Sequence, residues 1–318
     1  MAEDRIVAIE SFVVRVSDHS SLTLLQSFDS TGAEIASGTS DPVVSPDQKW
    51  IAFTKDGNVF LEKPDKKSVI QVNQDGTPST KTQFAVNSLI VGFAPDSKQL
   101  IYTVAPGKAD CPDCPSHQQK KRPAAYGFYL YTIATKRISP FALPGSIRVN
   151  EILDLDRIFI TRVGNYGDEM GILNLKPKES FVSLQKACAQ AASCSLSKTG
   201  AIADCTAIEK GQARIVECDN TLATERAITD PGHCITEFQM PQRSPAGQHL
   251  GFVQLLGECK SKRHALWIDQ KSVFECEALT AYTWVDESRL ITRCRGELKL
   301  IDLSGKKLQS IQVPTKPN

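Results

Sequence analysis

The sequence predicts an all-β protein, and three features carry that prediction: a recurring phrase, the spacing of its copies, and the strands that follow it. The phrase is a polar turn followed by a burst of apolar residues. Its clearest copies are SPDQKWIAF (45–53), APDSKQLIY (94–102) and SPAGQHLGF (244–252), and its weaker copies are LDLDRIFI (153–160), LSKTGAIA (196–203) and WVDESRLIT (284–292). Their first core aliphatic residues lie 40 to 58 positions apart, at Ile51, Leu100, Ile158, Ile202, Leu250 and Leu290. A period in this range is typical of a β-propeller or another repeat array.

Each part of the phrase has a physical reason. Pro46, Pro95 and Pro245 fix φ, and the Asp, Ser or Gly residues after them accept turn geometry, so the chain reverses just before each apolar run. The runs are apolar on both faces, as in WIAFT (50–54), which is expected for a strand covered above and below. The KDGN turn (55–58) predicts a hairpin into a second strand, VFLEK (59–63).

Four short strands fill each period, which is the composition of a propeller blade. The second repeat supplies SLIVGF (88–93), QLIYTV (99–104), GFYLYTI (127–133) and KRISPFAL (136–143). The fifth supplies ITEFQM (235–240), HLGFVQLL (249–256), HALWID (264–269) and SVFECE (272–277), and the sixth ends with 297–303 and 307–313. Residues 5–37 hold strand-like runs without the phrase, so they form either a degenerate seventh blade or strands that close the ring by pairing with the last blade. Seven four-stranded antiparallel blades are preferred, and six stay open.

The stretch SPDQKWIAFTKDGNVFLEK (45–63) resembles the repeat of TolB-type, WD40-like β-propellers, which carry a Ser-Pro-Asp-Gly-Lys (SPDGK) phrase between the first two strands of a blade. The likeness is good at 45–63, fair near 94 and 244, and poor at 153, 196 and 284. It departs at Gln48, where the family has Gly, and at Ala246, where it has Asp. The resemblance implies a propeller over most of the chain and a partner in an envelope complex, and it brings no catalytic residues.

Length and charge agree with one repeat array. We expect residues 1–318 to form a single propeller domain, with six repeats in 38–318, because no Pro/Ser/Gly linker divides the chain. The net charge is +1, so the sequence has no electrostatic footprint for nucleic acid or an anionic membrane surface. No apolar run approaches the roughly 20 residues of a membrane helix. Nucleic acid is therefore not expected as a partner, and no transmembrane segment is expected.

The ten cysteines indicate an oxidising compartment, because a dense, even set is typical of exported proteins. The expected location is the periplasm or the outside of the cell, with a signal peptide removed before Met1. Buried free thiols are the alternative. Because loop closure costs least between near neighbours, we expect sequential disulfides: Cys111–Cys114, Cys188–Cys194, Cys205–Cys218, Cys234–Cys259 and Cys276–Cys294.

The longest insertion, residues 105–125, is the predicted partner-binding loop. Its CPDC pair has the spacing of a thiol redox centre or half a zinc site, but it lies in a polar loop and is interpreted as a short disulfide clamp. The residues expected to contact a partner are Cys111, Cys114, His117, Lys120, Lys121 and Arg122.

Catalytic and cofactor motifs are not found in the sequence. It has no G-x-S-x-G elbow, H-E-x-x-H helix, P-loop or strand-linked GxGxxG, so no catalytic residue, cofactor or metal is predicted. Asp154 with Asp156 and Asp110 with Asp113 could bind calcium, but such pairs are more often solvated turn carboxylates. His233 beside Cys234 is interpreted as a loop histidine next to a bridged cysteine rather than a metal pair.

Three function classes follow. The leading hypothesis is a non-catalytic scaffold of the bacterial envelope or extracellular space that binds another protein, an envelope or surface component. The second is a sugar- or small-ligand-binding propeller in which Trp50, Trp267 and Trp284 stack on the ligand, although their strand positions favour core packing. The third is a propeller enzyme, a lyase or hydrolase with a channel active site, or else the regulatory propeller of a peptidase whose catalytic domain is not in this chain.

Overall fold

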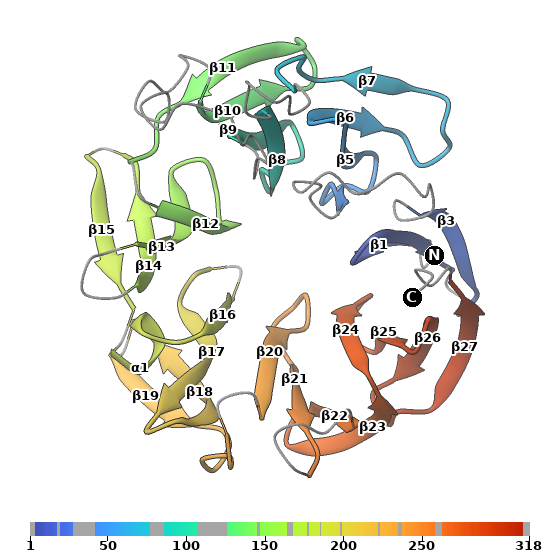
Figure 1. Ribbon diagram of the computed structural model, residues 1–318, viewed down its shortest axis with the longest axis vertical. Helices are drawn as coiled ribbons and strands as arrows, with labels where there is room; N and C mark the ends of the chain where they lie inside the picture. The colour runs from blue at the N-terminus through green and yellow to red at the C-terminus, as the bar shows by residue number, and fades with distance from the viewer. Residues whose placement is uncertain are drawn as a thin grey trace, which may run out of the picture. The chain divides into compact units, whose positions relative to one another are not determined.

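Seven antiparallel sheets follow one another along the chain in the computed structural model (Figure 1). The structure describes residues 4–17, 20–27, 42–76, 86–106, 126–144, 147–163, 168–176, 178–184, 186–197, 199–221, 223–234, 237–257 and 263–313. In these ranges six sheets have four strands, the first has three, and the helical element is a single turn, α1 (Lys186–Ala189). The predicted all-β propeller is confirmed, with seven blades rather than six.

The blades are numbered in chain order. Blade 1 comprises β1 (Arg5–Ile9), β2 (Phe12–Val16) and β3 (Leu22–Ser27); blade 2 comprises β4 (Val43–Val44), β5 (Ile51–Lys55), β6 (Asn58–Glu62) and β7 (Val69–Gln71). Blade 3 comprises β8 (Val86–Phe93), β9 (Gln99–Pro106), β10 (Gly127–Thr132) and β11 (Arg137–Phe141); blade 4 comprises β12 (Ile147–Ile152), β13 (Arg157–Arg162), β14 (Glu169–Asn174) and β15 (Ser180–Ser183).

The remaining blades follow the same plan. Blade 5 comprises β16 (Ser193–Leu196), β17 (Ile202–Glu209), β18 (Gln212–Asp219) and β19 (Thr224–Ala227); blade 6 comprises β20 (Phe238–Arg243), β21 (Leu250–Leu255), β22 (Arg263–Ile268) and β23 (Lys271–Glu277). Blade 7 comprises β24 (Leu279–Trp284), β25 (Arg289–Cys294), β26 (Glu297–Asp302) and β27 (Lys307–Gln312). The chain divides into two compact units: unit 1 is 1–9, 15–23 and 146–317, with blades 4 to 7, and unit 2 is 10–14, 24–145 and residue 318, with blades 2 and 3.

In the part of the chain that the structure describes, residues 5–27 form a sheet of their own, in the order β1-β2-β3, and β27 pairs with β26 alone. Residues 28–37 of the predicted segment lie outside the described residues. The first of the two alternatives for the N-terminal strands, a degenerate blade, is therefore correct. Within unit 1 this blade is joined to blade 7: the Leu22 N–H donates to the side-chain oxygen of Gln309.

The predicted hairpin at 55–58 is present, because β5 and β6 pair from Ile51↔Glu62 to Lys55↔Asn58. Asp56 and Gly57 occupy the left-handed region, with φ of 50° and 74°, as this tight turn requires. A Cβ at Gly57 would lie 2.7 Å from the Val86 carbonyl oxygen, so glycine also permits the close approach of blade 3.

The polar turn of the phrase joins the first two strands of a blade, and its serine closes that turn. In three copies the hydroxyl oxygen accepts the backbone N–H of the residue five positions on, at 3.0 Å: Ser45 from Trp50, Ser197 from Ile202, and Ser244 from His249. Serine recurs at this position because the backbone N–H at the end of each turn needs a hydrogen-bond acceptor.

These turns also bond one blade to the next. Within unit 2 the Asp47 N–H donates to Ser97 Oγ at 2.9 Å. Within unit 1 the corresponding bonds run from Arg157 to the Thr199 carbonyl at 3.3 Å, from the Ala246 N–H to the Glu287 carboxylate, and from Arg289 to the Ser17 carbonyl at 2.8 Å. The phrase is therefore a structural joint.

Apolar clusters fill the space between neighbouring sheets. Leu61 of blade 2 packs with Leu100 and Tyr102 of blade 3, and Leu266 of blade 6 packs with Leu290 of blade 7. Within unit 1, blades 5 and 6 pack against a neighbouring sheet on each face, so their strands bury side chains on both sides. This burial explains why the strand sequences are apolar throughout and do not alternate between apolar and polar residues.

Candidate functional site

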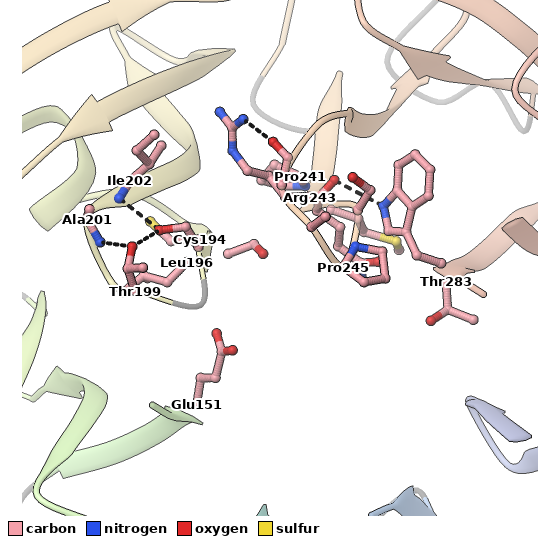
Figure 2. Close-up of a pocket in the computed structure, with 18 of the residues that line it drawn as sticks. Glu151, Cys194, Leu196, Thr199, Ala201, Ile202, Pro241, Arg243, Pro245 and Thr283 are labelled. Atoms are coloured by element: carbon pink, nitrogen blue, oxygen red, sulfur yellow. Dashed lines mark hydrogen bonds between the residues drawn. The ribbon is translucent and has the colours of Figure 1, made fainter. Parts of the chain in front are cut away.

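A pocket of about 880 Å³ lies within unit 1, where the first strands of four consecutive blades meet (Figure 2). Its lining comes from Glu151 of β12, from β16 and the turn after it, from residues 240–247 of β20 and its turn, and from Thr283 and Trp284 of β24. Each first strand is at the edge of its sheet and pairs on one side only. Among the described residues the other edge has no strand partner, although blade 7 side chains already bond the Met240 and Gln242 carbonyls. An edge of this kind suits an extended ligand.

Bulges shape three of these four strands. The register shifts between Val149 and Glu151 in β12, between Gln239 and Gln242 in β20, and between Leu279 and Ala281 in β24. A bulge re-aims the side chains around it. In β12 the extra residue is Asn150, whose amide donates to Thr161 Oγ1 at 2.9 Å, and the next residue, Glu151, lines the pocket.

Blade 7 holds the bulge of β20 in place. The Tyr282 hydroxyl donates to the Met240 carbonyl at 2.7 Å, and Trp284 Nε1 donates to the Gln242 carbonyl at 3.3 Å. Met240 itself adopts a φ of 54° and exposes 36% of its surface, so its flexible thioether forms part of the pocket wall. The wall on this side is apolar and adaptable.

The Glu151 carboxyl is the pocket's distinctive group. Water reaches it inside the pocket, yet protein surrounds it on most sides. This desolvation raises the pKa of Glu151 to about 7, and a hydrogen bond with the Leu196 backbone opposes the rise. The carboxyl therefore changes charge close to neutral pH.

Behind the pocket wall lies a cluster of paired charges. Arg243 Nε and Nη2 donate to the Asp204 carboxylate at 2.5 and 2.9 Å, and Nη2 also contacts Glu217. Arg226 pairs with Glu217 at 2.9 Å. Burial raises the pKa of Asp204 despite the opposing effect of Arg243. Burial also acts to lower the pKa of Arg243, but Asp204 and Glu217 outweigh it and raise that pKa. Two cations balance two anions here.

Hydroxyl groups follow one another along β16 and its turn. Ser197 Oγ and Thr199 Oγ1 are 3.2 Å apart, and Ser193 Oγ donates to Thr206 Oγ1 at 3.4 Å. Ser195, between them, is half-buried and also lines the pocket. This face of the pocket offers hydrogen bonds to a polar ligand.

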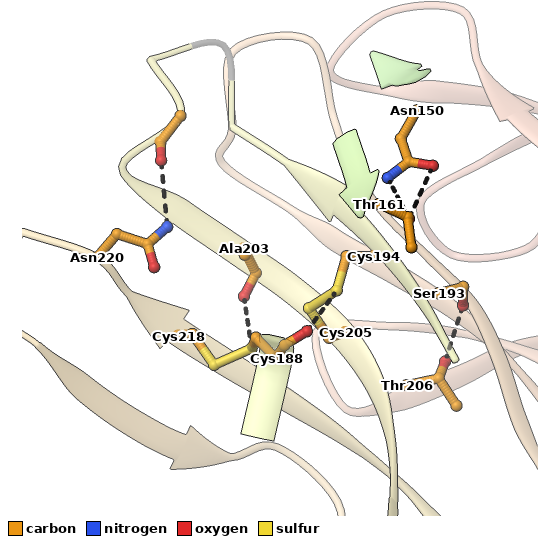
Figure 3. Close-up of a disulfide and its surroundings, with 11 residues drawn as sticks. Asn150, Thr161, Cys188, Ser193, Cys194, Ala203, Cys205, Thr206, Cys218 and Asn220 are labelled. Carbon is orange, nitrogen blue, oxygen red and sulfur yellow. Dashed lines mark hydrogen bonds between the residues drawn. A yellow bond between two sulfur atoms is a disulfide. The ribbon is translucent and has the colours of Figure 1, made fainter. Parts of the chain in front are cut away.

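Two disulfides fix blade 5 beside the pocket (Figure 3), and their pairing corrects the sequential one. The bonds join Cys188 to Cys218 and Cys194 to Cys205, so the predicted pairs Cys188–Cys194 and Cys205–Cys218 are wrong. Cys194 and Cys205 are direct partners in the register of β16 and β17, with Cα atoms 4.1 Å apart. Strand register decides the pairing, since doubling a loop costs only about 0.6 kcal/mol.

The predicted Cys276–Cys294 bond is confirmed. Of the pair Cys234–Cys259, Cys259 lies outside the described residues, and so does the whole of Cys111–Cys114. Of the predicted loop, Ala105 and Pro106 end β9, and residues 107–125 are not described. The predicted contact residues His117, Lys120, Lys121 and Arg122 lie in that range.

Of the two alternative calcium pairs, Asp110 and Asp113 lie outside the described residues. The other pair contacts basic side chains. Asp154 pairs with Arg157 at 2.8 Å and Asp156 with Lys176 at 3.1 Å, as turn carboxylates do. The His233 N–H donates to the Glu237 carboxylate. Among the described residues no group of three His, Cys, Asp or Glu side chains is placed to hold a metal ion.

The tryptophans are mainly packing residues. Trp267 stacks on Phe252 at 6.1 Å, and Trp50 packs against the cluster between blades 2 and 3. Trp284 is 8% exposed and stacks on His249 at 6.3 Å, although its edge lines the pocket. The pocket as such was not predicted. Of the three tryptophans proposed to stack on a ligand, Trp284 lines it, and Glu151, a carboxylate in a first strand, was not singled out.

Comparison with known proteins defines the class of fold. No family model matches the sequence, and no curated protein matches it. Among solved structures, a candidate 6-phosphogluconolactonase from Bacteroides uniformis is 11% identical with a TM-score of 0.54, over 98% of this chain and 97% of that one. A eukaryotic initiation factor is 9% identical with a TM-score of 0.51, over 98% and 96% of the two chains.

TolB from Acinetobacter baumannii is 13% identical with a TM-score of 0.50, over 98% of this chain. The chain spans 63% of the length of that TolB. At these identities the likeness shows the fold alone. The protein is a seven-bladed β-propeller whose structural neighbours include a TolB.

Proposed function

We propose that this protein is a non-catalytic binding propeller of the bacterial envelope or extracellular space, and that the pocket in unit 1 receives a segment of a partner protein. One observation carries the proposal: four edge strands from four blades enclose about 880 Å³ of space lined by backbone edges, hydroxyls and one carboxylate. Ligand sites are typically about 300–1,000 Å³. An extended segment can form main-chain hydrogen bonds with strand edges that have no strand partner among the described residues.

The exported location rests on two supports. Three disulfides lie in blades 5 to 7, and disulfides persist mainly in oxidising compartments. The TolB-like neighbour agrees with an envelope protein. In the part of the chain that the structure describes, no helix is long and apolar enough to cross a membrane.

The test is capture of a partner from the native envelope with mass-spectrometric identification. Ser195 lines the pocket, so a tyrosine there should project into the space that the partner occupies, and Ser195→Tyr should lose the partner that the wild type captures. The matched control is Thr224→Tyr, at an exposed position of β19 away from the pocket lining, and it should keep the partner. Equal capture by both variants, with equal thermal stability, would place the binding surface elsewhere, and replacing 105–125 by a Gly-Ser turn would then test the loop.

A second candidate is a lyase or hydrolase acting in the same pocket. One observation favours it: a carboxyl whose pKa lies near 7 suits a general acid or base at neutral pH. Turnover of a lactone or ester substrate that disappears in Glu151→Gln, with partner capture unchanged, would favour this candidate over the scaffold.

A further inference from the structure

We propose that the pocket in unit 1 is specific for a cation, and that the Glu151 carboxylate binds a protonated amine or guanidinium group of the ligand. The inference rests on the proposed function and names the chemistry that the same pocket selects. The group can come from a lysine or arginine side chain of the partner, or from a free small-molecule amine. Both sources share one chemistry, which the experiment below separates.

The charge balance of the lining carries the inference. Its charged side chains in the described residues are Glu151 and Arg243. Arg243 is committed to Asp204 and Glu217, and it donates to the Gly247 carbonyl as well. No described Lys, Arg or His forms an ion pair with Glu151. The pocket therefore presents one uncompensated anion, and such a carboxylate favours a positive partner.

Nearby cations on the same and the next strand are accounted for as well. On β13, Arg157 pairs with Asp154, and Arg162 lies over the ring of Phe181 at 3.9 Å. Arg148, on β12 itself, is exposed and does not line the pocket. The negative charge of Glu151 is thus left for a ligand.

The rest of the lining fits a basic side chain. Figure 2 shows Glu151 directed into the pocket, apart from Pro241, Arg243 and Pro245 on blade 6. Met240, Pro241 and Pro245 supply an apolar wall for an aliphatic stem, as long basic side chains prefer. Hydroxyls on β16 can accept the remaining N–H groups of the cation. The apolar wall therefore complements the aliphatic part of a basic side chain, and the hydroxyls and Glu151 complement its charged group.

A proton should leave when the cation binds. With a pKa near 7, Glu151 is partly protonated at neutral pH, and a bound cation stabilises its charged form. The ligand therefore displaces protons at pH 7 and fewer at pH 8. Arg243 also lines the pocket, but its guanidinium is paired with Asp204 and Glu217.

The experiment uses the full chain and isothermal titration calorimetry with three probes. The first is the blocked tripeptide acetyl-Gly-Lys-Gly-amide, the second is the same peptide with Gln for Lys, and the third is 1,5-diaminopentane. We expect the lysine peptide to bind and the glutamine peptide to bind at least about tenfold more weakly. Glu151→Gln should lower the affinity for the lysine peptide by a similar factor and abolish the proton release on binding at pH 7. Glu179→Gln, which removes an exposed carboxylate before β15, should change neither quantity.

Each outcome decides the proposal. A lysine peptide that binds better than the diamine identifies a partner side chain, and the reverse identifies a free amine; either result supports cation binding. Equal binding of the two peptides, full binding by Glu151→Gln, or no amine binding at millimolar concentration overturns it. Partner capture separates this from the proposed function: if Ser195→Tyr loses the partner while Glu151→Gln keeps it, the scaffold stands and the cation site fails.

Discussion

Blades 2 and 5 are built on the same plan but are held together differently. Blade 2 carries the strongest copy of the repeated phrase, no cysteine, and an apolar joint to blade 3. Blade 5, together with α1 before it, carries one of the weakest copies, four of the ten cysteines, and a joint to blade 6 in which a buried ion pair lies beside an apolar cluster. The pocket lies beside blade 5. The pocket is lined both by the weak copy of the phrase in blade 5 and by the clear copy at 244–247 in blade 6, so the strength of the phrase does not mark the candidate site.

The first and largest predicted effect tests the ionic joint. Arg243→Met removes one partner from a buried pair and leaves Asp204, whose side chain has no exposed surface, without its counter-ion. We expect a loss of about 3–5 kcal/mol in the free energy of unfolding, measured by urea denaturation. Adding Asp204→Asn should recover part of that loss, because the stranded charge is removed.

The control for that prediction is Arg226→Met, which breaks an ion pair whose arginine is 68% exposed. An exposed pair contributes about 0–1 kcal/mol. If Arg243→Met costs no more than Arg226→Met, the joint between blades 5 and 6 depends on packing, as the joint between blades 2 and 3 does, and the contrast between the blades disappears.

The second prediction concerns the cysteines of blade 5. Replacing Cys188 and Cys218 by alanine opens a cross-link between residues 30 positions apart and should cost about 2–4 kcal/mol. Reduction of the wild type should destabilise blade 5 and leave blade 2 unchanged, which hydrogen exchange can resolve. Non-reducing peptide mapping should find Cys194 bonded to Cys205; a Cys188–Cys194 peptide would contradict the structure.

The sequence predicted the turns and strands, which depend on neighbouring residues. It missed the disulfide pairing and the pocket, which depend on residues far apart in the sequence. Turn chemistry and apolar runs are local, so the phrase located β5, β9, β13, β17, β21 and β25 correctly. The disulfides of blade 5 were missed because strand register, not distance along the chain, sets Cys194 opposite Cys205. The pocket was missed because four blades contribute to it and bulges, which leave no sequence signature, orient Glu151.

The third prediction tests the shared turn. Ser45→Ala leaves the Trp50 N–H without its acceptor at a serine that is 1% exposed, and should cost about 1–3 kcal/mol. Ser197→Ala in blade 5 should cost less, because the Cys194–Cys205 bond next to it still holds the first two strands together. Ser304→Ala, at an exposed turn, is the control and should change stability little. Equal costs at Ser45 and Ser197 would show that the disulfide does not support the weak copy of the turn.

The last and smallest effect is a pH dependence of opposite sign in the two regions. In blade 2, burial acts to raise the pKa of Asp47, but hydrogen bonds from Ser45 and Lys49 outweigh it and lower that pKa below 3.8. The stability that Asp47 contributes is therefore present above pH 4 and is lost as the pH falls further. In the pocket, burial raises the pKa of Glu151 from 4.5 to about 7, so the folded state binds the extra proton.

The stability associated with that proton is present below pH 4.5 and is lost as the pH rises through 7. From pH 5 to pH 8, the unfolding free energy of the wild type should therefore fall relative to that of Glu151→Gln. The difference between the wild type and Asp47→Asn should stay constant over this range. Urea denaturation at pH 5, 6, 7 and 8 measures both differences, and groups common to all three proteins cancel. A constant difference for Glu151→Gln would mean that water solvates the carboxyl fully. The pocket would then lose the desolvated anion on which cation binding depends.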